Sequence, residues 1–324
     1  MDPMASNLDT LVTVFGGSGF LGRNVVRALC RRDYRVRVAV RRPELAGYLQ
    51  PSGKVGQVHT VQANVRYPAS IEAALRDSHV VVNLVGILAE GGAQSFDAVQ
   101  AKGAETIAKA AAAAGAQLIH VSAIGADAES PSRYARAKAA GEAAVLAAVP
   151  SATIFRPSVM FGPEDQFTNR FAALARMLPV LPLIGADTKM QPVYVGDVAT
   201  AVADAVDGKA KAGATYELGG PEVLTMREII EAILEIADRK PMLMPLPFGL
   251  ARFKANFLQF APGALKLTPD QVTLLARDNV VSDAAKAAGL TLEGLGITPD
   301  SLEAIAPQYL WRFRAAGQFQ RKSA

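Results

Sequence analysis

The sequence predicts an α/β fold, in which a doubly wound parallel sheet lies between layers of helices and is followed by a smaller, mainly helical C-terminal lobe. Short runs rich in Val, Ile and Leu alternate with helical segments through the first two thirds of the chain. These runs are continuously apolar, which is typical of parallel strands that are buried on both faces. After about residue 160, segments rich in Pro and Gly separate the helices, and this change predicts a differently built lobe.

The predicted elements follow one another in regular order. Strands are predicted at 11–16, 35–40, 79–86 and 117–123, and helices at 20–33, 71–77 and 96–115. Thr225 and Glu228 have the spacing of a capping box, which predicts a helix over 225–239. We expect a Rossmann-type domain over 8–160, with sheet and helices continuing to about 240, a smaller lobe over 161–314 and a basic tail over 315–324.

Composition narrows the classes of protein to consider. The chain has 324 residues, a formal net charge of +4 and one cysteine, Cys30, so it forms no intramolecular disulfide and suits a reduced, cytoplasmic-type compartment. Its three histidines, His59, His79 and His120, have no ligand spacing, and we predict no metal. No nucleic-acid motif, secretory signal or transit peptide is recognisable, and no run of about 18 apolar residues predicts a membrane span.

A glycine-rich loop follows the first predicted strand. Its glycines, Gly16, Gly19 and Gly22, form a Gly-x-x-Gly-x-x-Gly pattern that opens the first helix. Glycine is needed where the chain turns tightly and where backbone approaches a pyrophosphate, and the phosphates then bind the free N–H groups of the helix. We therefore predict that a dinucleotide contacts Gly16, Gly17, Ser18, Gly19, Phe20, Leu21 and Gly22.

The second predicted strand ends in Arg41 and Arg42. A fold of this type that prefers NAD carries an acidic residue at this position for the ribose hydroxyls, whereas a guanidinium suits a 2′-phosphate. NADP(H) is therefore favoured over NAD(H), with Arg41 as the better candidate. The alternative is that both arginines form a solvated surface.

Further cofactor contacts are predicted at the ends of later strands. Asn64 lies where an amide could meet the adenine edge, and Asn83, Val85 and Gly86 follow a strand beside the expected cofactor. The remaining predicted contacts are Val65, Val121, Pro157 and Val159.

The motifs resemble a known family. The glycine loop, "YARAK", "FRPSVMFGPED", "QPVYVGDVA" and "YELGGPE" follow one another as in an extended short-chain dehydrogenase/reductase, over residues 10 to about 240. "TVFGGSGFLGR", "LIHVSAIGA" and "SRYARAKAAGE" resemble more closely the atypical branch that contains the nucleotide-binding accessory subunit of respiratory complex I. The resemblance implies a tightly held, structural NADPH without established turnover, and a C-terminal lobe near the membrane arm.

Tyr134 and Lys138 are four residues apart, which places both on one face of a helix. The resemblance implies that active members use this pair for proton transfer, with a serine or threonine that holds the substrate oxygen. Against the usual pattern, Ser122 matches the first serine, whereas Ala123 occupies the catalytic position. We predict Tyr134, Lys138 and Ser122 as the catalytic group if turnover occurs. Two other interpretations of the pair are a set of ribose and nicotinamide ligands without turnover, and a coincidence of surface spacing.

Aromatic and basic residues mix in two C-terminal segments. Phe253, Phe257 and Phe260 have the spacing of one helical stripe, with Arg252 and Lys254 between them. This stripe either packs on the lobe's own core or around a pocket, or contacts lipid or a membrane partner. The segment "YLWRFRAAGQFQRK" has the same ambiguity.

Three functional hypotheses follow. The favoured one is a non-enzymatic NADP(H)-binding structural or assembly subunit associated with complex I, cytoplasmic and peripheral on the inner face of the membrane. The alternative is an active NAD(P)-dependent reductase, epimerase or dehydratase acting on a carbonyl or sugar-nucleotide substrate, so whether the chain is an enzyme stays open. A redox or nucleotide sensor that regulates a partner is the third.

Overall fold

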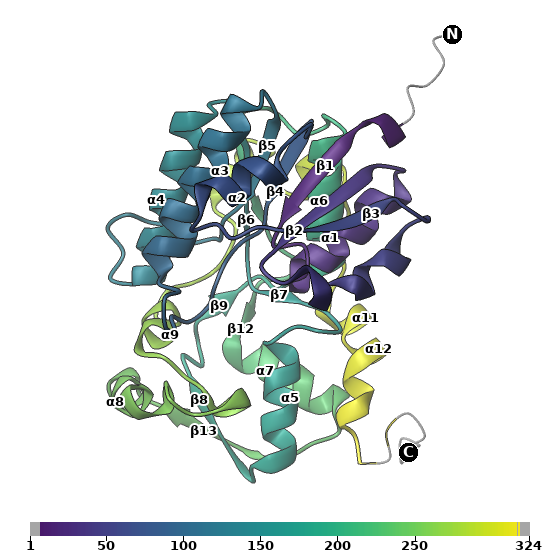
Figure 1. Ribbon diagram of the computed structural model, residues 1–324. Coiled ribbons are helices and arrows are strands. Elements are labelled where there is room, and N and C mark those ends of the chain that lie inside the picture. Colours follow the sequence, from purple (N-terminus) through teal and green to yellow (C-terminus); the bar gives the residue numbers. More distant parts are fainter. Residues whose placement is uncertain (1–6, 316, 318–324) are drawn as a thin grey trace. The chain divides into compact units, whose positions relative to one another are not determined.

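The computed structural model describes residues 7–315 and residue 317. The chain divides into two compact units that interleave along the sequence (Figure 1). The first unit contains the chain up to Pro157 together with Gly196–Glu217 and Asp283–Ile297. The second contains Ser158–Val195, Leu218–Ser282 and the chain from Thr298 onward.

A seven-stranded sheet forms the centre of the first unit, in the order β11-β6-β5-β4-β1-β2-β3. Its strands are β1 Leu11–Phe15, β2 Arg35–Val40, β3 Val58–Gln62, β4 Val80–Asn83, β5 Gln117–Val121, β6 Thr153–Pro157 and β11 Thr215–Leu218. Neighbouring strands from β3 to β6 pair in parallel. This arrangement confirms the predicted α/β class.

Helices cover both faces of this sheet. Those of the first unit are α1 Phe20–Arg31, α2 Pro68–Ala74, α3 Lys102–Ala113, α4 Arg133–Ala148, α6 Val195–Val206 and α10 Asp283–Ala287. Helices α2, α3 and α4 lie together on one face, and α1 and α6 lie on the other (Figure 1). Apolar side chains such as Ile71, Ile107 and Val145 pack against Val81 and Ile154 of the sheet, so helices and strands share one core.

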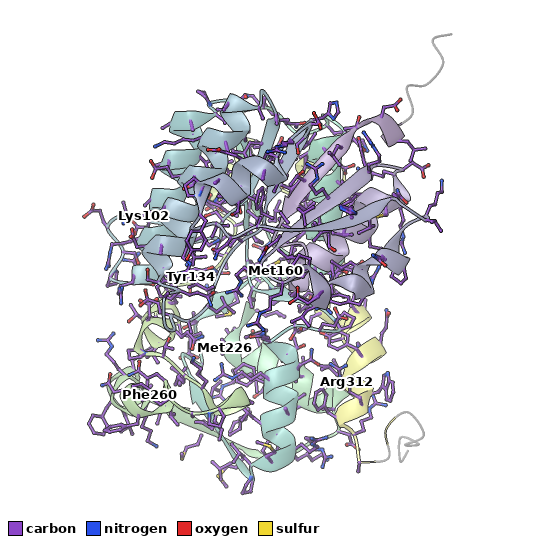
Figure 2. All side chains as sticks on the ribbon, viewed as in Figure 1. Lys102, Tyr134, Met160, Met226, Phe260 and Arg312 are labelled. Carbon is purple, nitrogen blue, oxygen red and sulfur yellow. The ribbon has the colours of Figure 1, made fainter. Side chains whose placement is uncertain are left out.

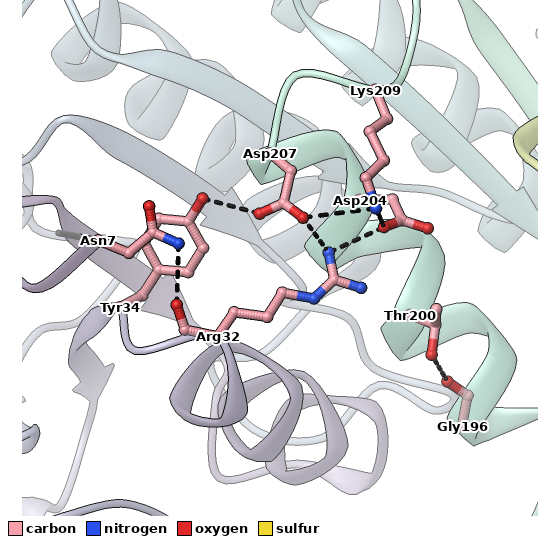
Figure 3. A network of polar contacts seen from close by, with 8 residues as sticks. All are labelled: Asn7, Arg32, Tyr34, Gly196, Thr200, Asp204, Asp207 and Lys209. Carbon is pink, nitrogen blue, oxygen red and sulfur yellow. Dashed lines mark hydrogen bonds and ion pairs between the residues drawn. The ribbon is translucent and has the colours of Figure 1, made fainter. Parts of the chain in front are cut away.

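A cluster of polar contacts links α1 and the start of β2 to α6 within the first unit (Figure 3). The Arg32 guanidinium lies 2.9 Å from a carboxylate oxygen of Asp204 and 2.6 Å from one of Asp207. The Tyr34 hydroxyl donates to Asp207 at 2.8 Å, and Lys209 pairs with Asp204 at 2.7 Å. The cluster therefore joins segments that are more than 170 residues apart in sequence.

The second unit combines helices with three pairs of short strands. Its helices are α5 Thr168–Met177, α7 Met226–Ile236, α8 Phe248–Leu258, α9 Pro269–Leu274, α11 Leu302–Ile305 and α12 Pro307–Leu310. The strand pairs are β7 Met160–Phe161 with β10 Val193–Tyr194, β9 Lys189–Met190 with β12 Leu224–Thr225, and β8 Val180–Ile184 with β13 Met242–Leu246. The capping box is present, because Glu228 N donates to Thr225 Oγ1 and Thr225 N donates to the Glu228 carboxylate.

Of the seven strands of the main sheet, β3, β6 and β11 were not among the strands predicted at 11–16, 35–40, 79–86 and 117–123. Strand β3 is only half buried at the sheet's edge, and β11 lies in a Gly- and Pro-rich stretch that was interpreted as a connection between helices. Among residues 7–315 and 317, no helix is long and apolar enough to cross a membrane.

Candidate functional site

The loop between β1 and α1 lies at the point where the sheet order reverses, since β1 has β2 on one side and β4 on the other. In open parallel sheets, ligands bind at the carboxyl ends of the strands next to this point. Gly16 has a φ of +78°, a conformation that favours glycine, and a Cβ there would lie 3.1 Å from the Leu84 carbonyl carbon. The loops that follow β1 and β4 therefore approach each other closely.

The N-terminus of α1 is open to an anion. Gly22 packs against the Gly16 carbonyl oxygen, which a Cβ on Gly22 would overlap. Within the described residues, α1 has neither a side-chain cap at Gly19 nor an acidic residue in its first turn. Its first N–H groups lack intrahelical partners, and the helix dipole favours negative charge there. A pyrophosphate fits this backbone cradle.

A pocket of about 550 Å³ lies beside the glycine loop in the first unit. It is lined by Ser18, Val40, Arg41, Arg42, Leu45 and Ala46, where Pro43–Leu45 form a 3₁₀ turn, η2, after β2. Both arginine side chains are exposed. The pocket thus combines loop backbone, apolar surface and two cations.

Tyr48 holds the glycine loop from the following 3₁₀ segment, η3 Gly47–Ser52. Its hydroxyl donates to the Ser18 carbonyl oxygen at 2.7 Å, and the Arg23 guanidinium lies 5.3 Å from the centre of its ring. Asn64, which was predicted to meet adenine, accepts a hydrogen bond from Arg66 N at 3.1 Å through Oδ1 and so shapes the turn after β3. Val65 follows it in this turn and lies near Gly103 of α3.

Asn83 is buried at the end of β4, and its side-chain amide forms hydrogen bonds with other groups of the protein. Its Oδ1 accepts from Val85 N at 3.1 Å, so its Nδ2 faces His120 Nδ1, also at 3.1 Å. Burial, together with the charge of Lys138, lowers the pKa of His120 to about 3. The imidazole is therefore neutral and accepts at Nδ1. Asn83 fixes the turn that carries Val85 and Gly86.

Helix α4 carries the predicted Tyr134–Lys138 pair, of which Tyr134 is labelled in Figure 2. The helix starts at the N-cap Ser132, whose side chain accepts from Ala135 N. Lys138 is 5% exposed and donates to the Val121 carbonyl oxygen at 3.2 Å, and its Nζ lies 6.0 Å from the centre of the Tyr134 ring. Because Lys138 is buried, the pair is not a coincidence of surface spacing.

Burial also changes the proton affinity of this lysine. Desolvation lowers the pKa of Lys138 from 10.5 to about 8, and the negative charge of Glu142, one turn further along α4, acts in the opposite direction. The lysine is thus mostly protonated at neutral pH, but it can lose its proton in mildly alkaline solution.

Four buried polar atoms near this pair have no hydrogen-bond partner among the described residues: Nε2 and Oε1 of Gln100, Oγ of Ser122 and Nε2 of His120. A Cβ on Gly86 would lie 3.5 Å from Lys138 Nζ and 3.7 Å from Gln100 Oε1, so both groups face the exposed Gly86 backbone. Buried polar groups without partners are unfavourable, and a ligand or water can satisfy them. This set therefore fits a hydroxylated ligand such as a ribose.

Gln100 was not predicted from the sequence. It lies in a π-helical turn, η4 Asp97–Ala101, that precedes α3. The turn lies against α4 at Gly141, where a Cβ would overlap the Gln100 carbonyl oxygen. The only sign of Gln100 in the sequence is that it is a polar residue within the alanine-rich segment 96–115. The π turn and its contact with α4, which place Gln100 near Lys138, depend on the folded structure.

Pro157 and Val159 were predicted to contact the cofactor. The preceding residue, Arg156, forms a bidentate pair with the buried Glu142, with Nε 2.9 Å from Oε1. Pro157 accepts from Ile124 N at 3.0 Å through its carbonyl oxygen. Val159 belongs to the second unit, where its carbonyl oxygen accepts from Val193 N. The first unit therefore brings together the predicted cofactor residues up to Pro157, but Val159 is not part of it.

Comparison with known proteins assigns a family to this arrangement. A family model described as "RmlD substrate binding domain" matches residues 10–255. NADH dehydrogenase (ubiquinone) 1 alpha subcomplex subunit 9 of Arabidopsis thaliana mitochondria is 38% identical, over 95% of this chain and 79% of that protein. The chain belongs to the RmlD substrate-binding-domain family of extended short-chain dehydrogenase/reductase-like proteins.

Two further similar proteins have different names. The ceramide reductase of Caulobacter vibrioides is 31% identical, over 97% of this chain and 98% of that protein. The crystal structure of an NADPH-dependent quinone oxidoreductase of Escherichia coli, in complex with NADPH, superposes with a TM-score of 0.71 at 19% identity and covers 93% of this chain and 99% of that one. This structural likeness supports the fold, and the relatives confirm the family resemblance predicted from the motifs.

Proposed function

We propose that this chain binds NADP(H) tightly and serves as a structural or assembly subunit of NADH:quinone oxidoreductase. The observation that carries the proposal is the pocket beside the glycine loop, whose six described lining residues include Arg41 and Arg42 and no acidic residue. A 2′-phosphate pairs with guanidinium groups, whereas the ribose hydroxyls of NAD prefer an acidic partner. The adenosine end of NADP(H) therefore suits this pocket.

The proposed subunit role is supported by the relatives and by the site. The Arabidopsis protein that is 38% identical over 95% of this chain is named as a subunit of NADH dehydrogenase (ubiquinone), which is complex I. Ala123 follows Ser122, so a second hydroxyl is missing where the family motif has one. A bound nucleotide still stabilises the fold without turnover, by about 2.7 kcal/mol at a hundred times its dissociation constant. In this proposal the chain associates peripherally with membrane-bound complex I subunits through its second unit.

An active reductase is the second candidate. The specific observation in its favour is that Lys138, with its pKa lowered to about 8, lies next to Tyr134 and near the unpartnered Ser122 hydroxyl. When bound, the nicotinamide supplies a hydride to a carbonyl carbon. Tyr134 would donate its hydroxyl proton to the carbonyl oxygen, Ser122 would hold that oxygen, and Lys138 would hold a ribose hydroxyl. The ceramide reductase relative, similar over nearly its full length, supports this alternative.

Native electrophoresis of mildly solubilised membranes tests the first proposal. We expect this chain to comigrate with NADH:quinone reductase activity, and we expect Gly19→Asp to abolish both nucleotide retention and comigration. Aspartate is a favourable N-cap, so the helix should still form, but its charge repels a pyrophosphate. Gly19→Ser is the matched control, because it adds a side chain without the charge. A chain that migrates alone in the soluble fraction contradicts the subunit proposal.

Tyr134→Phe separates the two candidates. If the chain is a reductase, NADPH-dependent turnover of a carbonyl substrate should disappear while NADPH retention stays unchanged. If it is a structural subunit, the variant should support the membrane NADH:quinone reductase activity as well as the wild type does. Turnover that survives in Tyr134→Phe rules out the tyrosine as the proton donor.

A further inference from the structure

An apolar, basic segment free of acidic residues lies in the second unit. From Arg239 to Pro269 the sequence contains no Asp or Glu. It contains five cations, namely Arg239, Lys240, Arg252, Lys254 and Lys266. The chain as a whole has 34 basic and 30 acidic residues, so this local imbalance does not follow from the overall composition.

Helix α8, at the centre of this segment, is turned with its large side chains outward. Its inner side consists of Ala251 and Ala255, which pack against Leu246 and Val272. Its outer side exposes 61% of Phe253 and 67% of Phe257, and Phe260 just beyond the helix is 83% exposed. The three rings therefore do not pack in the lobe's own core, so core packing does not explain the predicted stripe.

Other large apolar side chains of this segment are also exposed. Leu250 of α8 is 46% exposed, and Met242 and Met244 of β13 are 68% and 46% exposed. Arg252 and Lys254 of α8 are exposed as well. Large apolar side chains exposed together on one helix mark an interaction site, and an apolar helix face flanked by cations suits the boundary between headgroups and acyl chains.

The described part of the other mixed aromatic and basic segment, residues 309–315 and 317, does not belong to this surface. Figure 2 shows Phe260 and Arg312 at opposite sides of the second unit. Arg312 donates to the Pro163 carbonyl oxygen and to Asn169, and Arg314 donates to the Ile236 carbonyl oxygen, so these cations hold the unit's own backbone. The predicted basic tail, 315–324, lies outside the described residues except for 315 and 317.

We propose that the α8 face, formed by Leu250, Arg252, Phe253, Lys254, Phe257 and Phe260, binds the surface of an anionic lipid bilayer. The phenyl rings enter the interfacial region while the cations contact lipid phosphates, and the absence of acidic residues across the segment avoids repulsion from an anionic surface. The proposal is independent of nucleotide binding, turnover and association with complex I, because a bilayer without protein should be enough.

Flotation of the full chain with protein-free vesicles tests this inference. We expect binding to vesicles that contain phosphatidylglycerol, little binding to pure phosphatidylcholine, and weakening at high salt, since salt screens the charges. Phe253→Ser combined with Phe257→Ser should reduce binding about tenfold or more, and so should Arg252→Glu combined with Lys254→Glu. Val55→Ser combined with Tyr67→Ser is the matched control, because these exposed side chains lie in the first unit.

A thermal unfolding transition at the wild-type temperature in each variant would show that the chain is folded. Equal binding by the wild type and the α8 variants, or no binding to either kind of vesicle, would overturn the proposal. Binding only to native membrane vesicles, and not to protein-free anionic vesicles, would assign the face to a protein partner instead.

Discussion

Arg41 and Arg42 directly follow β2, and their exposed side chains line the pocket beside Ser18 of the glycine loop. If Arg41 contacts a 2′-phosphate, Arg41→Ala removes a charge-assisted hydrogen bond, and the affinity for NADPH should fall roughly 10- to 100-fold. The affinity for NADH should change little, because NADH lacks that phosphate. Calorimetric titration of both nucleotides checks this, with Arg42→Ala as the matched variant. An equal loss for NADPH and NADH would contradict the assignment.

Lys138 should make nucleotide binding depend on pH. Its pKa is lowered from 10.5 to about 8 by burial, and ribose hydroxyls accept from the charged ammonium. The affinity for NADPH should therefore be highest below about pH 8 and decline above it, by up to about tenfold per pH unit. Lys138→Met should bind more weakly and should lose this decline. A decline that persists in Lys138→Met would show that another group titrates.

The lowered pKa of Lys138 also makes the stability of the folded chain depend on pH, in a direction that follows from proton binding. The unfolded lysine keeps its proton up to about pH 10.5, whereas the folded one releases it near pH 8, so the unfolded state holds more protons between these values. The destabilisation from burying this charge is complete below pH 8 and is relieved as the pH rises toward 10.5. Ligand binding and folding of the ligand-free chain therefore respond to alkaline pH in opposite directions.

The sequence is enough to predict some residues of the candidate site but not others. The glycine loop, Arg41, Arg42 and the Tyr134–Lys138 pair are recognisable because their spacing is local. Gln100 was missed, because its position depends on the contact between η4 and α4, which spacing along the chain does not contain.

At the scale of secondary-structure elements, the contact between α4 and the π turn η4 positions the residues of the candidate site. Gly141 allows the Gln100 backbone to lie against α4, and an added Cβ would overlap the Gln100 carbonyl oxygen. Gly141→Ala should force the two elements apart and lower the free energy of unfolding by roughly 1–3 kcal/mol. It should also weaken NADPH binding, because Gln100 and Lys138 would move.

Thermal unfolding and nucleotide titration measure these two effects. Ala143→Ser, on the exposed side of the same helix, is the control and should leave both quantities near the wild-type values. If Gly141→Ala unfolds at the wild-type temperature and retains NADPH as tightly, the contact does not position the site.

Strands β3 and β11 illustrate the limit of prediction at the scale of elements. The continuous apolar strands at the centre of the sheet were predicted because both of their faces are buried. The edge strands have a partly exposed face and neighbours rich in Gly and Pro, so their sequences resemble connections. Pairing with the sheet decides their conformation, and this pairing is a tertiary effect.

At the scale of the whole molecule, the chain returns to the first unit twice after leaving it at Pro157. The returning segment 196–217 is joined to α1 by Arg32, whose guanidinium is 24% exposed and whose partner Asp204 is 7% exposed. Arg32→Met should lower the free energy of unfolding by roughly 1–3 kcal/mol, because Asp204 and Asp207 each lose a charged donor. Chemical denaturation measures this change.

The exposed pair between Lys54 and Asp33 provides the comparison. Lys54→Met should change stability by less than about 0.5 kcal/mol, since exposed ion pairs contribute little. Equal effects of Arg32→Met and Lys54→Met would mean that the cluster in Figure 3 does not hold the returning segment.

The central claim is that the first unit binds NADP(H) in preference to NAD(H). Calorimetric titration of the purified, nucleotide-free chain with NADPH and with NADH at neutral pH tests it most directly. We expect one NADPH to bind per chain, at least about tenfold more tightly than NADH, because NADPH adds one phosphate–arginine contact. Tighter binding of NADH, or no binding of either nucleotide, would contradict it.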